Sequence, residues 1–247
     1  MPVVKNKSIH IGMLGTCAIL VDGQLISGVP SSFYKIAAFL LLSGRQESVS
    51  RQRLRSILWS EDGDAERAAA NLRRSIARIR ELQASLGFSL IQSNFNTVYL
   101  NKTANVSWDL WDYLRTLSSG NPMGEYPGEL LADLKNTGPD FEDWLAEQRA
   151  MLRSRHIDRL AEELTRNGTS PSNRSGQLAL AQKILTVDPC NEEAYRLLML
   201  DAADHNNLAR LEQIYQKCEA EMKRELGVSI SSETRKLYAN LVSALTG

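Results

Sequence analysis

The pattern of apolar and polar residues over the first hundred positions predicts a small sheet followed by helices. Apolar residues alternate with polar or small ones over residues 9–13, as in a half-buried strand. A second apolar run at 18–21 leads through the Asp-Gly pair at 22–23 into an apolar pair at 25–26, which indicates strands joined by a tight turn. Over residues 33–43 the apolar positions change to helical spacing, so we expect a first helix that belongs to the core.

Two further helices and a hairpin follow. Residues 48–59 predict a second helix in which Ser50 is the N-terminal cap. Strong helix formers fill residues 65–86, and Gly87 stands at the C-cap position, so the third helix is the longest of this half. Residues 88–100 alternate around a polar, turn-prone tip, which predicts a hairpin. A strand cluster, three helices and a hairpin in this order are typical of a winged helix.

The third helix has an apolar arc and a polar stripe. At about 100° per residue, six apolar side chains share one arc: Ala68, Leu72, Ile76, Ile79, Leu82 and Leu86. That arc, which also contains Ser75, should face the core. On the opposite side Arg67, Asn71, Arg74 and Arg78 fall within a span of about 60°. Arginine pairs with guanine, asparagine pairs with adenine, and both bind phosphate, so the stripe has the chemistry that a major-groove helix needs.

The order of the elements decides how this stripe is interpreted. On an isolated amphipathic helix, a row of arginines is usually only the solvated face. Here the basic third helix is followed at once by a hairpin, and this arrangement favours DNA binding. Arg73 and Arg80 lie on a different flank, where they serve backbone phosphates or structure. The wing tip at 94–97 is expected to touch the minor groove or phosphate, and the alternative is a plain exposed turn.

The second half carries no comparable strand pattern and is predicted to be all helical. Proline and glycine break it into helices, and from Gln177 onward helix pairs have about the length of tetratricopeptide units. Such hairpins bury their faces only by stacking, and their concave surface commonly binds protein or peptide. Trp108 and Trp111 stand three apart on one helical face, where we expect core packing. The fold class is mainly α with a small β component: a winged helix-turn-helix followed by an all-α, tetratricopeptide-like domain.

Charge separates the two halves. The chain of 247 residues holds 29 Lys plus Arg and 29 Asp plus Glu, a formal net charge of zero. Residues 1–100 hold 12 basic and 7 acidic residues, a net of +5, whereas residues 101–247 hold 17 and 22, a net of −5. The basic half is therefore the one expected to meet nucleic acid. Cys17, Cys190 and Cys218 lack metal-ligand spacing, and without an export signal or a membrane-spanning run we expect a reducing cytoplasm.

Five segments resemble the Streptomyces antibiotic regulatory protein family: IGMLGTCAILVDGQ, SRQRLRSILW, NLRRSIARIREL, YPGELL and NEEAYRLLMLDAADHNNLARLEQIYQKCEAEMKRELGVSISSETRKLY. The resemblance implies an OmpR-type winged-helix DNA-binding domain over residues 1–104. It implies a bacterial transcriptional activation domain of tetratricopeptide-like helices over residues 105–247. It further implies a transcription activator that binds repeated promoter sites in double-stranded DNA and recruits RNA polymerase, and it leaves open whether a homodimer forms on DNA.

The resemblance also bears on single residues. The NLRRSIARIREL match makes Asn71, Arg74 and Arg78 candidates for base recognition, and the SRQRL match places Arg51 near the DNA backbone. Together with the helix and wing patterns, this gives nine predicted DNA-binding residues: Arg51, Arg67, Asn71, Arg73, Arg74, Arg78, Asn94, Asn96 and Thr97.

Two other classes of function compete with DNA binding. For an enzyme, His10, His156 and His205 are isolated, and neither a phosphate-binding loop nor a nucleophile elbow occurs, so we expect no catalytic residue, cofactor or metal. The stronger alternative is a protein-interaction adaptor in which the helical repeats bind a partner and the winged helix does not bind DNA. Salt separates the two, because only a DNA binder loses affinity for a duplex steeply with ionic strength.

Overall fold

The computed structural model describes most of the chain as two compact units. The described residues are 7–43, 48–59, 65–101, 103–135, 138–166 and 174–246. Unit 1 comprises residues 1–120 and 127–152, and unit 2 comprises residues 121–126 and 153–247. The family-domain boundary expected at residue 104 stays a prediction.

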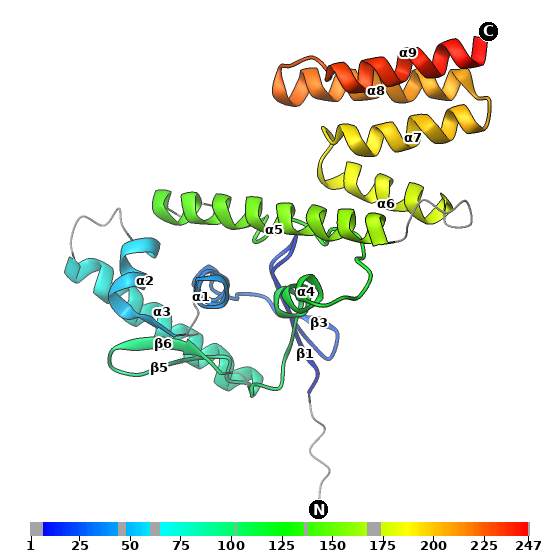
Figure 1. The fold of residues 1–247 in the computed structure, drawn as a ribbon. Helices are drawn as coiled ribbons and strands as arrows, with labels where there is room; N and C mark the ends of the chain where they lie inside the picture. The colour runs from blue at the N-terminus through cyan, green and yellow to red at the C-terminus, as the bar shows by residue number, and fades with distance from the viewer. Residues whose placement is uncertain are drawn as a thin grey trace, which may run out of the picture. The chain divides into compact units, whose positions relative to one another are not determined.

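A four-stranded sheet opens unit 1. Its strands lie in the order β3-β2-β1-β7: β3 (Gln24–Leu25), β2 (Ala18–Val21), β1 (Ile9–Gly12) and β7 (Ser107–Trp108). Figure 1 labels β1 and β3 of this sheet. The first three strands confirm the pattern seen in the sequence. The prediction that the second half is all helical is wrong at β7, which pairs in parallel with β1 through Ile11 and Trp108. Two residues are too short to show alternation, and their partner strand lies far away along the chain.

Three helices and a second sheet form the winged helix. They are α1 (Ser31–Leu42), α2 (Arg51–Leu58), α3 (Ala65–Leu86), β4 (Ser48–Ser50), β5 (Ile91–Ser93) and β6 (Thr97–Leu100), with the strands in the order β4-β6-β5. Ser50 caps α2 as predicted, because its hydroxyl accepts a hydrogen bond from the Arg53 backbone at 3.2 Å. Residues 48–50 are a strand and not the start of that helix, since they pair with β6. Gly87, with φ +83°, follows the last residue of α3 as predicted.

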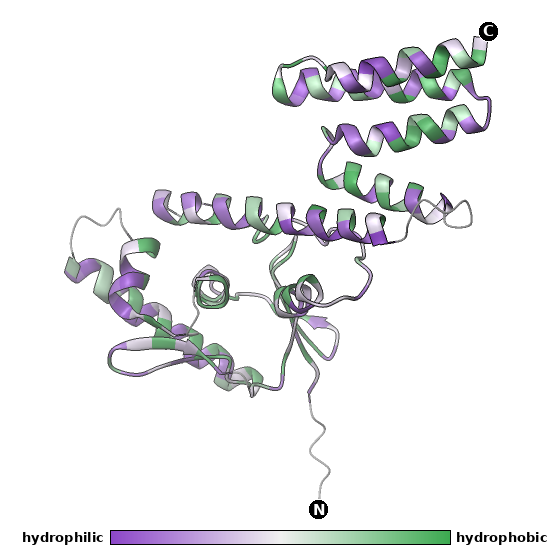
Figure 2. Cartoon of the chain, in the orientation of Figure 1, coloured by the Kyte–Doolittle hydropathy of each residue, from purple (hydrophilic) through white to green (hydrophobic). Residues whose placement is uncertain are grey.

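Helix α1 lies in the core of unit 1. Phe33, Ile36 and Leu40 are completely buried, and the Phe33 ring meets the edge of Phe88 at 6.2 Å between centroids. Figure 2 shows polar and apolar residues alternating along α3, as a helix with one buried face requires. Helix α3 therefore packs with one face against the core of the winged helix, and its other face is exposed.

Residues from the second half of the sequence complete unit 1. Asp109, the first residue of α4 (Asp109–Ser118), accepts hydrogen bonds from the backbone N–H groups of Met13 at 2.8 Å and Leu14 at 3.0 Å. Trp108 just before it is buried, but Trp111 is 37% exposed. The core packing expected for the pair is wrong for Trp111, because Trp108 is extended and the two do not share a helical face.

The YPGELL segment makes a second connection inside unit 1. The backbone N–H of Gly15 donates to the Glu129 carbonyl at 2.8 Å. Gly128 has φ +118°, and a Cβ there would lie 3.1 Å from the Gly15 nitrogen, so only glycine fits without displacing backbone. Arg149 of α5 (Pro139–Arg166) donates to the carbonyls of the next two residues of the segment, 130 and 131. We call this connection the Gly15–Gly128 interlock.

Unit 2 is a stack of helical hairpins. The second part of α5 is followed by α6 (Arg174–Val187), α7 (Glu192–Asp204), α8 (Leu208–Leu226) and α9 (Ser232–Thr246). Neighbouring helices from α6 to α9 pack on each other, and a core of seven buried residues joins α7, α8 and the α8–α9 turn: Tyr195, Met199, Ala202, Leu211, Cys218, Met222 and Ile230. This confirms the predicted tetratricopeptide-like arrangement.

The final family segment is fastened to α7 by one carboxylate. Glu192 accepts hydrogen bonds from the backbone and hydroxyl of Ser231 and from the hydroxyl of Thr234. Desolvation opposes the charge, but these hydrogen bonds prevail and lower the pKa of Glu192 below its ordinary value. The ELGVSISSET segment thus caps α9 and joins it to α7.

A second carboxylate lies close to two arginines and a histidine at one end of the stack. Asp201 is 2% exposed, with the Arg210 guanidinium at 3.5 Å, the His205 ring nitrogen at 3.4 Å and Arg174 at 3.8 Å. Arg174 also forms an ion pair with Asp204 at 2.7 Å. These pairs join the ends of α6, α7 and α8.

His156 is another buried polar residue of unit 2. It is completely buried in α5, with its ring centroid 5.3 Å from that of Tyr126. Burial, with a smaller effect from Lys183, lowers its pKa. The folded unit therefore favours the neutral imidazole.

Candidate nucleic-acid interface

Helix α3 is held by its apolar face. Four of the six predicted core residues are buried: Ala68, Leu72, Ile76 and Ile79. Leu82 and Leu86 are only half-buried. In the last turns of the helix the buried side chain is Gln83, whereas the sequence pattern predicts Leu82 and Leu86.

Gln83 joins α3 to the wing. Its Oε1 accepts hydrogen bonds from the backbone N–H groups of Leu90 at 2.8 Å and Ile91 at 2.7 Å, and its Nε2 donates to the Ile91 carbonyl at 2.9 Å. The amide therefore satisfies three backbone groups that the edge of β5 leaves unpaired. It fixes the start of the wing relative to α3, a role for which the sequence gives no signal beyond one polar residue in an apolar arc.

Arg80 adds a second connection between α3 and the wing. Its guanidinium donates to the Ser93 hydroxyl at 2.7 Å and to the Ser93 carbonyl at 3.2 Å. The sequence predicts that Arg80 either contacts backbone phosphates or supports the structure, and these hydrogen bonds show the supporting role.

The wing tip is a closed turn built on Asn94. Its side-chain oxygen accepts hydrogen bonds from the backbone of Asn96 at 2.9 Å and from the backbone and hydroxyl of Thr97 at 2.8 and 3.1 Å. The Asn96 carbonyl accepts a hydrogen bond from the backbone of Arg51 at 2.9 Å, which ties the tip to the first residue of α2. The oxygen of Asn94 is thus engaged in the turn itself.

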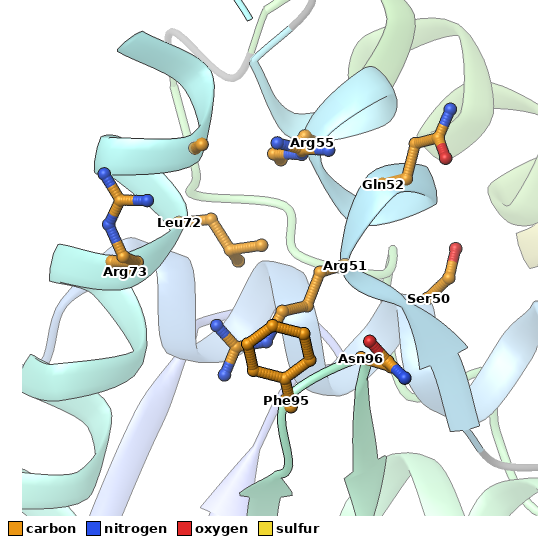
Figure 3. Close-up of a pocket in the computed structure, with 9 residues that line it drawn as sticks. Ser50, Arg51, Gln52, Arg55, Leu72, Arg73, Phe95 and Asn96 are labelled. Atoms are coloured by element: carbon orange, nitrogen blue, oxygen red, sulfur yellow. The ribbon is translucent and has the colours of Figure 1, made fainter. Parts of the chain in front are cut away.

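A hollow of about 480 Å³ opens where α2, α3 and the wing tip meet (Figure 3). Nine residues line this wing hollow: Ser50, Arg51, Gln52, Arg55, Ala69, Leu72, Arg73, Phe95 and Asn96. It brings together three of the predicted residues, Arg51, Arg73 and Asn96. The other lining side chains of chemical interest, Gln52, Arg55 and Phe95, were not predicted.

The wing hollow is cationic. Arg51, Arg55 and Arg73 line it, and none of its nine described lining residues is acidic. The Nε atom of Arg51 is buried without a hydrogen-bond partner among the described residues. A guanidinium with an unused donor beside two further arginines is suited to an anion such as phosphate. Arg55 lies four residues after Arg51, on the same helical face, and this spacing could have revealed it from the sequence.

The predicted stripe on α3 lies on another flank of the helix. Arg74 and Arg78 are exposed, and Arg74 donates to the side-chain oxygen of Asn71. Arg67 is exposed near the start of the helix. None of these four residues lines the wing hollow, so α3 carries basic side chains on two flanks.

Arg78 lines a second hollow, of about 260 Å³, beside the start of α1 and the end of α2. Lys35 lies in it too, with its ammonium 5.5 Å from the centroid of the Phe141 ring. Burial lowers the pKa of Lys35, and the neighbouring Glu142 opposes that shift. Cations therefore flank α3 on this side as well.

Nothing in the described ranges forms a cluster of three or more His, Cys, Asp or Glu residues able to hold a metal ion. The three cysteines are free thiols. Burial raises the pKa of each, to about 12 for Cys218, which keeps them protonated at neutral pH.

No described helix has the length and apolar composition needed to cross a lipid bilayer.

Comparison with known proteins gives one family and one fold. The model of the bacterial transcriptional activator domain matches residues 115–242, a little over half of the chain. Among solved structures, EmbR from Mycobacterium tuberculosis, solved in complex with a low affinity phosphopeptide, aligns with a TM-score of 0.64 and 17% sequence identity. The alignment covers 97% of this chain and 66% of that one, so this chain spans less than two thirds of EmbR. No curated protein matches the sequence.

These findings agree with the architecture. The family model covers all of α6, α7 and α8 and most of α9, and the similarity to EmbR extends through the winged helix. The family is one of transcriptional regulators. The chain therefore belongs to the bacterial transcriptional activator domain family, which confirms the resemblance to the Streptomyces antibiotic regulatory proteins.

Proposed function

We propose that this protein is a sequence-specific DNA-binding transcription regulator that activates promoters with repeated sites. The observation that carries the proposal is the wing hollow, where three arginines from α2 and α3 meet the wing tip without an acidic neighbour among the described lining residues. A duplex supplies the matching charge, because its phosphates lie on both sides of the groove that a helix enters.

In this proposal α3 lies in the major groove. Arg74 and Arg78 pair with base edges or phosphates, Asn71 reads adenine, and Arg67 contacts the backbone near the start of the helix. Arg51 and Arg73 hold phosphates from the wing hollow, and Arg55 joins them.

The wing contributes smaller contacts. Asn96 is exposed, whereas the side-chain oxygen of Asn94 and the Thr97 hydroxyl are hydrogen-bonded to each other within the turn. We therefore rank Asn96 first among the three wing residues. Its partner is phosphate or the edge of a base in the minor groove.

In this proposal unit 2, the helical unit, binds the protein partners. Stacked helical hairpins offer a surface for another protein, and for an activator that protein is RNA polymerase. A homodimer on adjacent repeats would place two such surfaces at one promoter. A regulator of this kind works on the bacterial chromosome, and hence in the cytoplasm.

Selection from a pool of random duplexes at moderate salt tests DNA binding directly. We expect enrichment of a repeated motif and a fall of about 0.9 log units in affinity per log unit of salt for each phosphate contact. Arg78→Ala should lower specific affinity by about 1 to 3 kcal/mol, and Asn71→Ala should relax preference at one base position. A pool without enrichment and a duplex affinity independent of salt would favour the adaptor function instead.

A further inference from the structure

The tip of the wing carries the most exposed large apolar side chain of the described residues. Phe95 is 92% exposed, compared with 68% for Leu25 and 59% for Leu226. Single exposed apolar residues are common on protein surfaces, so exposure alone assigns no role to Phe95. The role of Phe95 follows instead from the hydrogen bonds that hold its backbone and from the side chains next to its ring.

The backbone on both sides of Phe95 is fixed. Asn94 before it accepts three hydrogen bonds from Asn96 and Thr97, and the Asn96 carbonyl after it accepts one from Arg51. The phenyl ring therefore projects from a closed turn whose position relative to α2 is set before any partner arrives. Such preorganisation lowers the entropy lost on binding.

The neighbours of the ring select the partner. Phe95 lines the wing hollow together with Arg51, Arg55 and Arg73, so an apolar prong stands beside three positive charges (Figure 3). The partner that fits must present anions at its surface and apolar, stackable groups just behind them. Duplex DNA has this arrangement, with phosphates outside and base pairs reached through the minor groove.

Resting on the proposed function, we propose that Phe95 is an apolar wedge that enters the minor groove beside the site read by α3 and partly unstacks one base step. The arginines of the wing hollow hold the flanking phosphates while the ring enters. The duplex then bends away from the wing. Pyrimidine–purine steps unstack most readily, so the wedge adds sequence preference at a position that α3 does not touch.

The test compares Phe95→Ala and Phe95→Leu with a matched control, Leu25→Ala, which removes another exposed apolar side chain from β3. The probe is a duplex carrying the selected motif, with dyes at its ends for bending and 2-aminopurine at adenines beside the wing. Because Phe95 is exposed, Phe95→Ala should unfold at the wild-type temperature. It should bind about tenfold more weakly, lose the bend and the 2-aminopurine signal, and keep the salt slope, since no phosphate contact is removed.

Phe95→Leu should retain most of the bend, and Leu25→Ala should match the wild type throughout. A mismatch placed at the unstacked step should strengthen wild-type binding and leave Phe95→Ala unchanged, because the mismatch lowers the cost of unstacking. Wild-type affinity and bending in Phe95→Ala would overturn the wedge while DNA binding stands. A loss seen only when two copies occupy adjacent sites would assign Phe95 to a protein contact, and a wild-type chain that binds no duplex would overturn both proposals.

Discussion

The two compact units use arginine in opposite ways. In unit 1 the wing hollow contains Arg51, Arg55 and Arg73, and none of the described carboxylates lines it. In unit 2, by contrast, Arg174 and Arg210 form ion pairs with the buried Asp201. The formal net charges of the units barely differ: unit 1 holds 16 basic and 15 acidic residues, a net of +1, and unit 2 holds 13 and 14, a net of −1. The comparison teaches that unsatisfied charge locates a binding surface better than total charge does.

The largest expected effect comes from reversing the charge of the arginines in the wing hollow of unit 1. Arg51→Glu combined with Arg73→Glu should reduce duplex affinity about a hundredfold or more at moderate salt, because two attractive contacts become repulsive. The unfolding temperature should change little, since neither side chain has an ion pair to lose within the described ranges. Binding isotherms and thermal unfolding measure the two effects.

The matched control is Arg210→Glu in unit 2, which places a carboxylate beside Asp201. It should lower the unfolding temperature and leave duplex affinity at the wild-type level. If both charge reversals weakened DNA binding equally, the division of roles between the units would be wrong.

The second effect concerns what holds the wing. Gln83→Ala should cost about 3 kcal/mol of unfolding free energy, because two buried backbone N–H groups lose their acceptor. Gln92→Ala is the control, since that side chain donates a 3.2 Å hydrogen bond to the Ser89 hydroxyl and accepts none from a buried backbone N–H of the described residues, so its loss should cost much less. Urea unfolding measures both. Equal stability of the two variants would remove Gln83 from the support of the wing.

The third effect tests the internal pairing of unit 2. Asp201→Ala should cost about 2 kcal/mol, because Arg174 and Arg210 lose a buried partner but keep access to water. Asp204→Ala removes an exposed partner of Arg174 and should cost about 0.5 kcal/mol. A larger loss for Asp204 than for Asp201 would show that burial does not set the strength of these pairs.

The smallest effect is a difference in acid sensitivity. The folded pKa of His156 lies below its ordinary value of 6.5, so protons bind the unfolded chain more readily and stability falls as the pH drops below 6.5. Glu192, lowered from 4.5, loses its contribution as the pH falls further, through its folded pKa. Both groups lie in unit 2, so we expect unit 2 to unfold first as the pH falls. Hydrogen exchange measured at decreasing pH should show loss of protection in unit 2 before unit 1. Glu192→Gln should make stability less dependent on pH below 4.5, and an unchanged profile would contradict this assignment.

The features that depend on a few neighbouring residues were predicted from the sequence. The length of α3, its end at Gly87 and the Ser50 cap follow from propensity and capping, which act over a few residues. Strand β7 was missed because its partner is distant in sequence, and Gln83 because hydrophobic periodicity assigns a polar residue to solvent. The wing hollow was predicted only in part. Arg51 and Arg73 come from separate helices, and only the folded chain places them beside Phe95.

The Gly15–Gly128 interlock limits how this architecture can be recombined. A chimera joined at residue 104 would separate Asp109 from the N–H groups that it caps and would leave Gly15 facing a foreign loop. A crossover after Leu152 would keep every contact of unit 1 within one parent, although residues 121–126 belong to unit 2. The winged helix and the first part of the family domain are therefore inherited as a single module, in evolution as in the design of hybrid regulators.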